Sequence, residues 1–317
     1  MRPIRFIPDN TSIRFMWLRR YIFPLSAILS VVSVAIFIFI GPQYGIDFRG
    51  GTIVEIKPAV EPADIAGIRS MLTQLDLGEV QVQEVTDFTG ETTVLIRVQQ
   101  QPGGDEAQQE VIAKVRQAFG DTVEFRRVEV VGPRVSGELA YNGTIALLVT
   151  LVAIMIYVWF RFEWQFSIGA IIATLHDVLM TLGFFVVAGL DFNLASIAAI
   201  LTIVGYSLND TVVVYDRVRE NLRKYKKMPI SEILDRSVNE TLARTSITGV
   251  TTLLALLALF FLGGQVIRGF VAAMIFGVVI GTYSSIFIAA PILIFFKLRP
   301  GRAEDVGTGV AETAGEA

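Results

Sequence analysis

The residue with the clearest chemical potential is Asp210, a carboxylate inside an apolar stretch that is long enough to cross a membrane. An ionised carboxylate facing lipid costs about 2.5–3.5 kcal/mol at the centre of a span, so such a residue needs a partner or a function. Arg244 lies at the entry to the next apolar stretch and could neutralise Asp210. Protonation of Asp210 would cancel that attraction and let the helices repack. The alternative is that both residues lie at helix ends and reach the membrane interface.

Four other polar residues of the apolar stretches could take part in a proton relay or in helix packing: Asp177, His176, Asn209 and Tyr206. Asp177 lies in the middle of a stretch, on a face with small residues at four-residue spacing, so we expect it to face other helices. A relay role and a structural hydrogen bond both remain open for it. For His176, the single histidine, the alternative is a backbone or hydroxyl partner within the helices.

The composition indicates a membrane protein. Hydrophobic residues make up 53% of the 317 residues and charged residues only 18%, which is too apolar for a soluble chain of this length. The absence of cysteine excludes disulfides, thiolate metal sites and a cysteine nucleophile. No phosphate-binding or metal-ligand spacing is evident at 41–140. We expect no metal, no cofactor, no nucleic-acid partner and no enzymatic activity.

Six stretches are long enough to span about 30 Å of hydrocarbon. They cover residues 22–40, 145–160, 166–190, 192–215, 247–262 and 270–296. The first lacks a small-residue cleavage site, so we interpret it as an uncleaved span and not as a signal peptide. When the spans are threaded alternately, most Lys and Arg fall on the side of the amino terminus. The positive-inside rule then places both termini in the cytoplasm.

The loop at 41–140 predicts an extracytoplasmic domain. Apolar alternation predicts strands at 53–56, 81–85, 93–98 and 122–131, and helical spacing predicts helices at 62–75 and 105–119. The order β-α-β-β-α-β is typical of the ferredoxin-like fold. The predicted fold class is an α-helical polytopic membrane protein with six transmembrane helices and an external α+β ferredoxin-like domain between the first and second spans.

The predicted organisation has five parts. They are a cytoplasmic segment at 1–21, the first transmembrane helix at 22–40, the external domain at 41–140, a five-helix remainder at 141–302 and a disordered cytoplasmic tail at 303–317. The remainder includes a basic cytoplasmic connector at 216–246, whose basic stretch at 217–227 we expect to contact anionic lipid, with a translocase or ribosome-side partner as the alternative. Its last span carries a stripe of small residues, Ala273, Gly277, Gly281, Ser285 and Ala289. That stripe favours packing within the chain over a subunit interface.

Three motifs resemble a known family. They are GIDFRGGT at 45–52, GYSLND at 205–210 followed by DRVREN at 216–221, and LHDV at 175–178. In sequence and position they closely resemble the signatures of the SecD/SecF family of protein-export membrane proteins, and of its SecF branch in particular. The family belongs to the resistance-nodulation-division superfamily, whose half-transporters have six spans and a large external loop after the first.

The resemblance implies a role in secretion at the bacterial inner membrane. SecF works with SecD beside the SecYEG channel, and the pair uses the proton gradient to draw an unfolded preprotein outward; YajC and YidC are further expected partners. Asp210 and Arg244 match the family's proton-transfer pair. The structural signature is matched by Asp47, Phe48, Gly50 and Gly51.

Two other classes of function are weighed against this one. A proton-driven small-molecule efflux subunit of the same superfamily would share the architecture. An intramembrane aspartyl protease would use two carboxylates such as Asp177 and Asp210, but the chain has no Gly-x-Gly-Asp segment, and Arg244 would compete for the charge of Asp210.

Overall fold

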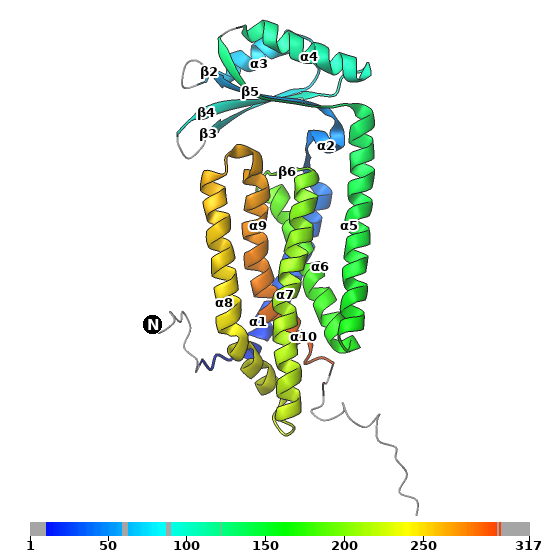
Figure 1. The fold of residues 1–317 in the computed structure, drawn as a ribbon, viewed down its shortest axis with the longest axis vertical. Coiled ribbons are helices and arrows are strands. Elements are labelled where there is room, and N and C mark those ends of the chain that lie inside the picture. Colours follow the sequence, from blue (N-terminus) through cyan, green and yellow to red (C-terminus); the bar gives the residue numbers. More distant parts are fainter. Residues whose placement is uncertain (1–10, 59–62, 87–89, 121, 297, 299–317) are drawn as a thin grey trace, which may run out of the picture.

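The fold is known from a computed structural model, which describes residues 11–58, 63–86, 90–120, 122–296 and 298. A bundle of long helices forms one part, and a sheet with two helices lies across one end of it (Figure 1). The expected tail at 303–317 lies outside the described residues, as does the start of the expected segment 1–21.

Six helices of the described chain are long and apolar enough to cross a membrane, which confirms the predicted number of spans. The last span consists of α9, a π-helical turn η1 and α10 in succession. The bounds are α1 Phe15–Phe39, α5 Pro133–Arg161, α6 Trp164–Val187, α7 Leu194–Lys224, α8 Ile230–Leu262, α9 Gln265–Ser284, η1 Ser285–Ala289 and α10 Ala290–Ile292.

Most of these helices extend beyond the apolar stretches that predicted them. α7 and α8 together take up nearly all of the basic segment 216–246, so it is not a separate connector. Hydropathy marks the membrane, whereas backbone hydrogen bonds continue the helix through polar residues. α5 begins at Pro133, so residues 133–140 form its first turns. Phe192, which we placed in a span, lies in a short strand before α7.

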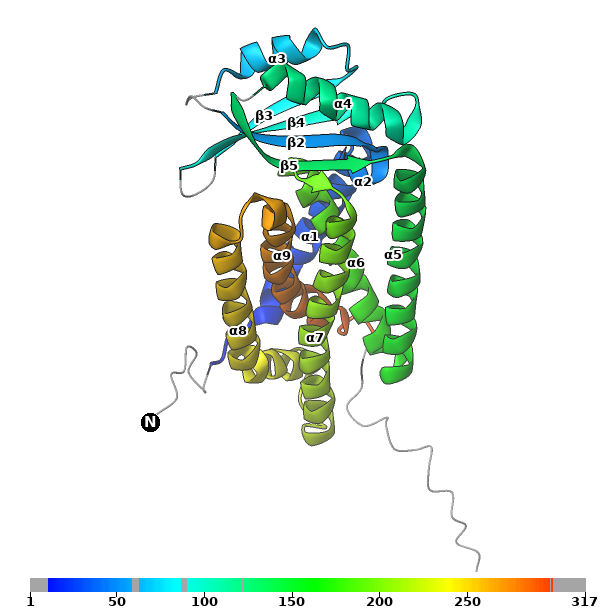
Figure 2. The same cartoon turned by 45° about the horizontal axis from the view of Figure 1, so that its top comes forward.

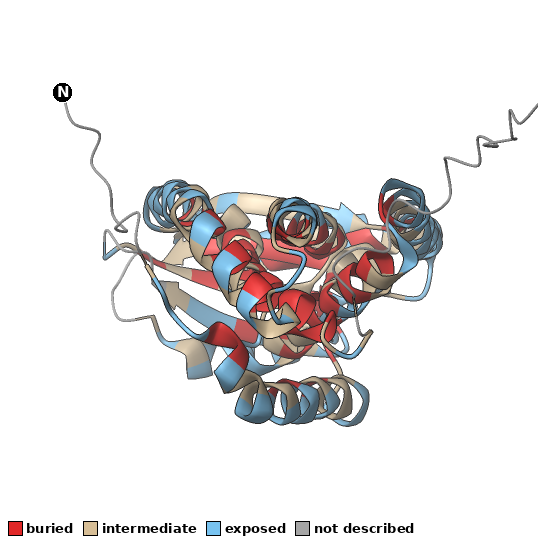
Figure 3. Ribbon diagram, turned by 90° about the horizontal axis from the view of Figure 1, so that it is seen from below, coloured by how far each residue is buried: buried red, intermediate tan, exposed pale blue. Residues whose placement is uncertain are grey.

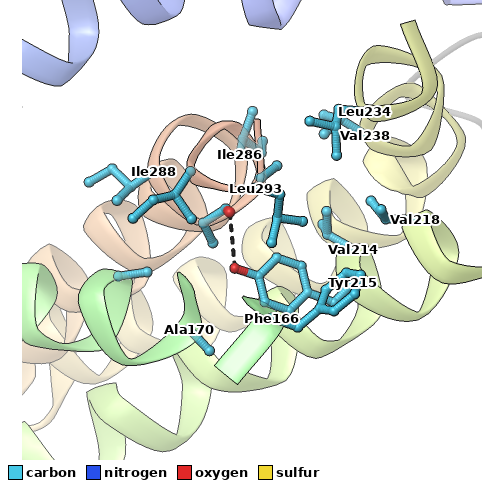
Figure 4. Close-up of a cluster of buried hydrophobic side chains, with 14 of the residues drawn as sticks. Phe166, Ala170, Val214, Tyr215, Val218, Leu234, Val238, Ile286, Ile288 and Leu293 are labelled. Atoms are coloured by element: carbon cyan, nitrogen blue, oxygen red, sulfur yellow. Dashed lines mark hydrogen bonds between the residues drawn. The ribbon is translucent and has the colours of Figure 1, made fainter. Parts of the chain in front are cut away.

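The bundle has three inner and three outer helices. The inner ones are α6, α7 and the last span, which are far more buried than α1, α5 and α8. Figure 3 shows the buried residues gathered in the middle of the bundle. At its centre, Tyr215 of α7 packs against Phe166 and donates its hydroxyl to the Ala289 carbonyl of η1 at 2.9 Å (Figure 4). This bond ties α7 to the irregular turn of the last span.

The small-residue stripe packs against α7 of the same chain. A Cβ added at Gly277 would lie 2.2 Å from Cγ1 of Ile203, and one at Gly281 would lie 3.0 Å from Cβ of Ser207. The first distance is too short for a side chain and the second is tighter than most side-chain contacts, so the glycines of the last span pack directly against α7. The expected packing within the chain is therefore confirmed.

Replacing Gly277 with alanine should destabilise the bundle. The added methyl group would force Ile203 to move in a packed interior, and overpacking of this kind costs about 1–3 kcal/mol. The measurement is the apparent Tm of the purified protein in detergent. Gly269→Ala is the matched control, because a Cβ at Gly269 of the same helix meets nothing within 4 Å. Equal melting temperatures for the two variants would contradict this packing.

The external domain has the predicted order of elements. It comprises β2 Gly51–Pro58, α3 Ile65–Thr73, β3 Val80–Thr86, β4 Thr92–Gln99, α4 Gly104–Phe119 and β5 Val123–Val131. The strands are antiparallel in the order β3-β4-β2-β5. Helices α3 and α4 cover one face, and the other face turns toward the bundle (Figures 1 and 2). Val54, Ile96 and Val115 fill the core between the helices and the sheet. This arrangement is compatible with the ferredoxin-like expectation.

Three short elements between the domain and the bundle were not predicted. Strand β1, Gln43–Tyr44, pairs in parallel with β6, Asp191–Phe192, and α2, Ile46–Arg49, follows β1. They lie where the sheet approaches the outer ends of α6 and α7 (Figure 1).

Candidate functional site

Asp210 lies inside the bundle, where α7 faces α8 and the last span. Only 2% of it is exposed. The Thr282 hydroxyl, on the last span, lies near the carboxylate. The Oδ2 atom of Asp210 is buried and has no hydrogen-bond partner among the described residues. A buried carboxylate with an unpaired oxygen is well suited to gain or lose a proton, because no full set of hydrogen bonds stabilises the ionised or the protonated form.

Two further unpaired polar atoms come from helices that line this region. Within the described chain, the hydroxyls of Tyr206 on α7 and Thr245 on α8 are also buried without a hydrogen bond of normal geometry, and the hydroxyls of Thr252 and Thr282 lie near that of Tyr206. Tyr206 is one turn before Asp210 on α7. A Cβ added at Gly249 of α8 would lie 3.7 Å from the hydroxyls of both Tyr206 and Thr282, so this glycine faces the same polar cluster. Buried hydroxyl groups without a protein partner commonly bind water. A chain of hydroxyl groups and water molecules can pass protons to a carboxylate.

Arg244 does not close an ion pair with Asp210. It lies on α8, its side chain is exposed, and its charge acts on the Asp210 carboxylate through space. Across the described ranges, no direct ion pair joins the two side chains. The predicted partners are therefore on facing helices, with the arginine turned toward the outside of the bundle.

Asp177 is the centre of a separate, fully bonded cluster. It is completely buried, and its Oδ2 accepts the hydroxyls of Ser207 at 2.5 Å and Ser284 at 2.6 Å. His176 Nδ1 lies 2.9 Å from its Oδ1. These contacts join α6, α7 and the last span. The arrangement favours the helix-packing role that we weighed against a relay.

The other candidates divide between these two clusters or lie outside them. The His176 ring packs near Tyr283, with 6.2 Å between centroids, and the Tyr283 hydroxyl meets the Ser26 hydroxyl of α1 at 2.6 Å. Asn209 is exposed on α7. Ser207, which bonds Asp177, lies one turn before Asp210 on α7. The clusters around Asp177 and Asp210 therefore draw on the same helix, but no hydrogen bond among the described residues joins the two carboxylates.

Several hydroxyl groups at the two clusters were not predicted. They belong to Ser207, Thr245, Thr282 and Ser284. Ser and Thr commonly form hydrogen bonds between membrane helices, which is the one sequence signal they carry. Which of them faces a carboxylate depends on how the helices are rotated against each other.

The signature residues lie at the junction of the two parts of the protein. Asp47 Oδ2 accepts the backbone N–H of Leu194 at 3.0 Å, and Phe48 packs in a group of aromatic rings. Gly50 and Gly51 have φ values of +71° and +126°, and a Cβ at Gly51 would lie 2.5 Å from the Val98 carbonyl oxygen. Both positions require glycine. Within the described ranges, no group of three His, Asp or Glu could hold a metal ion.

Together these features define a class of protein: a multi-pass membrane protein with a polar site inside its bundle and an external domain between its first two spans. The family model described as protein export membrane protein SecD/SecF, C-terminal, matches residues 111–299, and the SecD/SecF GG motif matches residues 35–58. The chain belongs to the SecD/SecF family.

Relatives extend this similarity over nearly the whole chain. The protein translocase subunit SecF of Rhodobacter capsulatus is 44% identical over 307 residues, covering 93% of this chain and 92% of the relative. SecF of Rickettsia bellii is 46% identical over 304 residues, covering 93% and 96%. SecDF of Brucella abortus is 45% identical over 98% of this chain, which spans only 40% of that longer protein.

A solved structure has the same fold. The crystal structure of SecDF, a translocon-associated membrane protein from Thermus thermophilus, superposes with a TM-score of 0.82 at 34% identity. The superposition covers 94% of this chain and 40% of that one. The protein is thus a multi-pass protein of a bacterial membrane.

Proposed function

We propose that this chain is a SecF-type subunit of the Sec protein-export machinery, which works with SecD and uses the proton gradient to promote export of unfolded preproteins. It acts as a transport subunit and not as an enzyme. One observation carries the proposal: a chain similar to SecF proteins over nearly its whole length has a buried carboxylate with an unpaired oxygen inside its bundle. The efflux alternative has no comparable support.

The proton gradient supplies enough free energy for such a role. One charge that crosses the full membrane potential gains about 2.3 kcal/mol per 100 mV. A tenfold change in a conformational equilibrium takes about 1.4 kcal/mol, so a single proton can shift the helices decisively. The shift does work only if protonation and release occur in different conformers. We propose that Asp210 is the group that changes charge and that Arg244 stabilises its ionised form in one conformer.

SecD is the proposed second half of the transporter. SecDF of Brucella abortus has more than twice the length that this chain covers, and the match accounts for 40% of it. Arg244 is exposed at the side of the bundle, where an acidic group of a second membrane subunit could pair with its guanidinium. SecYEG, YajC and YidC are further proposed partners. Both termini are proposed to be cytoplasmic, because basic residues gather around the end of α7 and the start of α8.

Purification of the tagged chain from membranes should recover a second six-span protein with a related domain after its first span. A half-transporter leaves charged and apolar faces without a partner, and those faces should hold the second half. The measurement is mass spectrometry of the mild-detergent eluate, with an unrelated tagged six-span protein as control. A monodisperse complex that supports export without such a partner would refute the proposal.

A loss-of-function assay separates export from efflux. Depletion of this chain should cause secretory precursors to accumulate and should remove the gradient-dependent part of precursor translocation into inverted vesicles. The measurement is precursor import with and without a gradient, alongside uptake of a fluorescent drug. Drug accumulation with normal precursor processing would favour the efflux alternative.

A further inference from the structure

The outer end of α7 is hydrogen-bonded to the segment that leads into the external domain. In the parallel pair β1 and β6, Gln43 lies opposite Asp191 and Tyr44 lies opposite Phe192. The Gly45 N–H then donates to the Phe192 carbonyl at 2.9 Å. Because β6 leads directly into α7, the entrance to the domain and the start of α7 are held together by backbone hydrogen bonds.

Asp47 adds a bond to the first turn of α7. Its carboxylate accepts the N–H of Leu194, the first residue of the helix, at 3.0 Å. The first N–H groups of a helix have no partner within it, and a carboxylate there is stabilised by the helix dipole. Asn193 already caps the same turn by accepting the Ser196 N–H at 3.0 Å. Asp47 therefore supplies a second cap from outside the helix, on α2, which leads into β2.

Arg97 ties the sheet itself to the same place. It lies on β4 between the buried residues Ile96 and Val98, so its side chain leaves the sheet on the face opposite α3 and α4. Its guanidinium donates to both carboxylate oxygens of Asp191, with one contact at 2.6 Å. The side chains are only 21% and 30% exposed. A bidentate arginine–carboxylate pair of this kind fixes the relative orientation of the two side chains better than a single surface ion pair does.

Aromatic rings fill the junction between these polar contacts. The ring of Phe192 lies 6.2 Å from that of Tyr44, 5.9 Å from that of Phe48 and 5.6 Å from that of Phe185. They come from β1, α2, α6 and β6. Close-packed rings resist shear, so the junction can transmit a displacement instead of absorbing it.

We propose that Asp47 and Arg97 couple the external domain mechanically to α7, so that a movement of α7 caused by a change of charge at Asp210 moves the domain. Asp210 and Leu194 lie on one uninterrupted helix, about 24 Å apart at about 1.5 Å per residue. Asp47 and Arg97 act as positioning residues. The inference rests on the proposed function, because it takes proton transfer at Asp210 as the driving event.

The test measures movement directly in the complex of the full chain with SecD. The chain has no cysteine, so single cysteines at Glu110 on α4 and Leu262 at the outer end of α8 can carry spin labels, and both positions are exposed. Asp210→Asn, which fixes the site neutral, should shift the distance distribution between the labels. Adding Asp47→Ala and Arg97→Met should abolish that shift. If Asp210→Asn shifts nothing, or if the shift survives the two added substitutions, the coupling is refuted.

Export measurements separate coupling from simple anchoring. Asp47→Ala with Arg97→Met should reduce the gradient-dependent component by about fivefold or more, the lower range of allosteric coupling, and leave gradient-independent export unchanged. Arg127→Met is the matched control, because Arg127 lies on the same face of the sheet but pairs with Glu129 inside it, at 2.7 Å. Equal loss in both components would indicate an anchor and overturn the proposal.

Exchanging the charges of Arg97 and Asp191 distinguishes loss of their ion pair from misfolding of the variant. Arg97→Asp alone should lose the gradient-dependent component, and Arg97→Asp with Asp191→Arg should recover it, because the ion pair is restored with reversed polarity. Failure to recover, with the complex assembled normally, would also overturn the coupling. If Asp210→Asn abolishes gradient-dependent export but moves no label, the proposed function stands and only the coupling fails.

Discussion

Asp210→Asn should abolish the gradient-dependent part of export while the chain still inserts and binds its partner subunit. Asparagine keeps the size of the side chain and can still meet the Thr282 hydroxyl, but it cannot be ionised. The helices would therefore stay in the conformer that belongs to the neutral site. The measurement is precursor translocation into inverted vesicles with and without a proton gradient, with expression and complex assembly checked separately.

Asp216→Asn is the matched control for this experiment. It makes the same substitution on the same helix, at a side chain that is 46% exposed and pairs with Arg161 near the end of α7. This variant should keep the gradient-dependent component. If Asp210→Asn also keeps all of it, the carboxylate is structural and the proton path lies elsewhere.

The spans and the domain could be predicted because their signals are local. A run of apolar residues marks a span, and alternation over four to eight residues marks a strand, whatever the rest of the chain does. Asp210 could be found in the same way, because an acid in an apolar run is conspicuous. The bounds were less accurate, since polar residues at the ends of α7 and α8 continue the helices.

The contacts of the site could not be predicted, because they depend on helix rotation and on distant partners. Ser207 and Ser284 meet Asp177 only because α7 and the last span present those faces to α6. Arg97 and Asp191 are separated by 94 residues, and each alone resembles an ordinary surface charge. Two-residue strands such as β1 and β6 have no periodicity to detect.

Substitutions at Asp177 should separate structural support from proton transfer. Asp177→Leu should strongly lower the apparent Tm of the purified protein, because it leaves the Ser207 hydroxyl and His176 without their buried partner. Each unpaired buried group costs about 1–3 kcal/mol. Asp177→Asn keeps an oxygen for the two serine hydroxyls, and its amide can donate to Nδ1 of a neutral His176. It should melt close to the wild-type temperature.

The export assay completes the argument for Asp177. If the carboxylate only holds α6, α7 and the last span together, Asp177→Asn should retain most of the gradient-dependent component, unlike Asp210→Asn. Both variants make the same chemical change in the same bundle, so the difference between them reports the role of charge at each site. An Asp177→Asn protein with a normal Tm and no gradient-dependent export would show that Asp177 must also change its charge. The proton path would then involve both clusters, with Ser207, which bonds Asp177 and lies one turn before Asp210 on α7, as the first residue to substitute next.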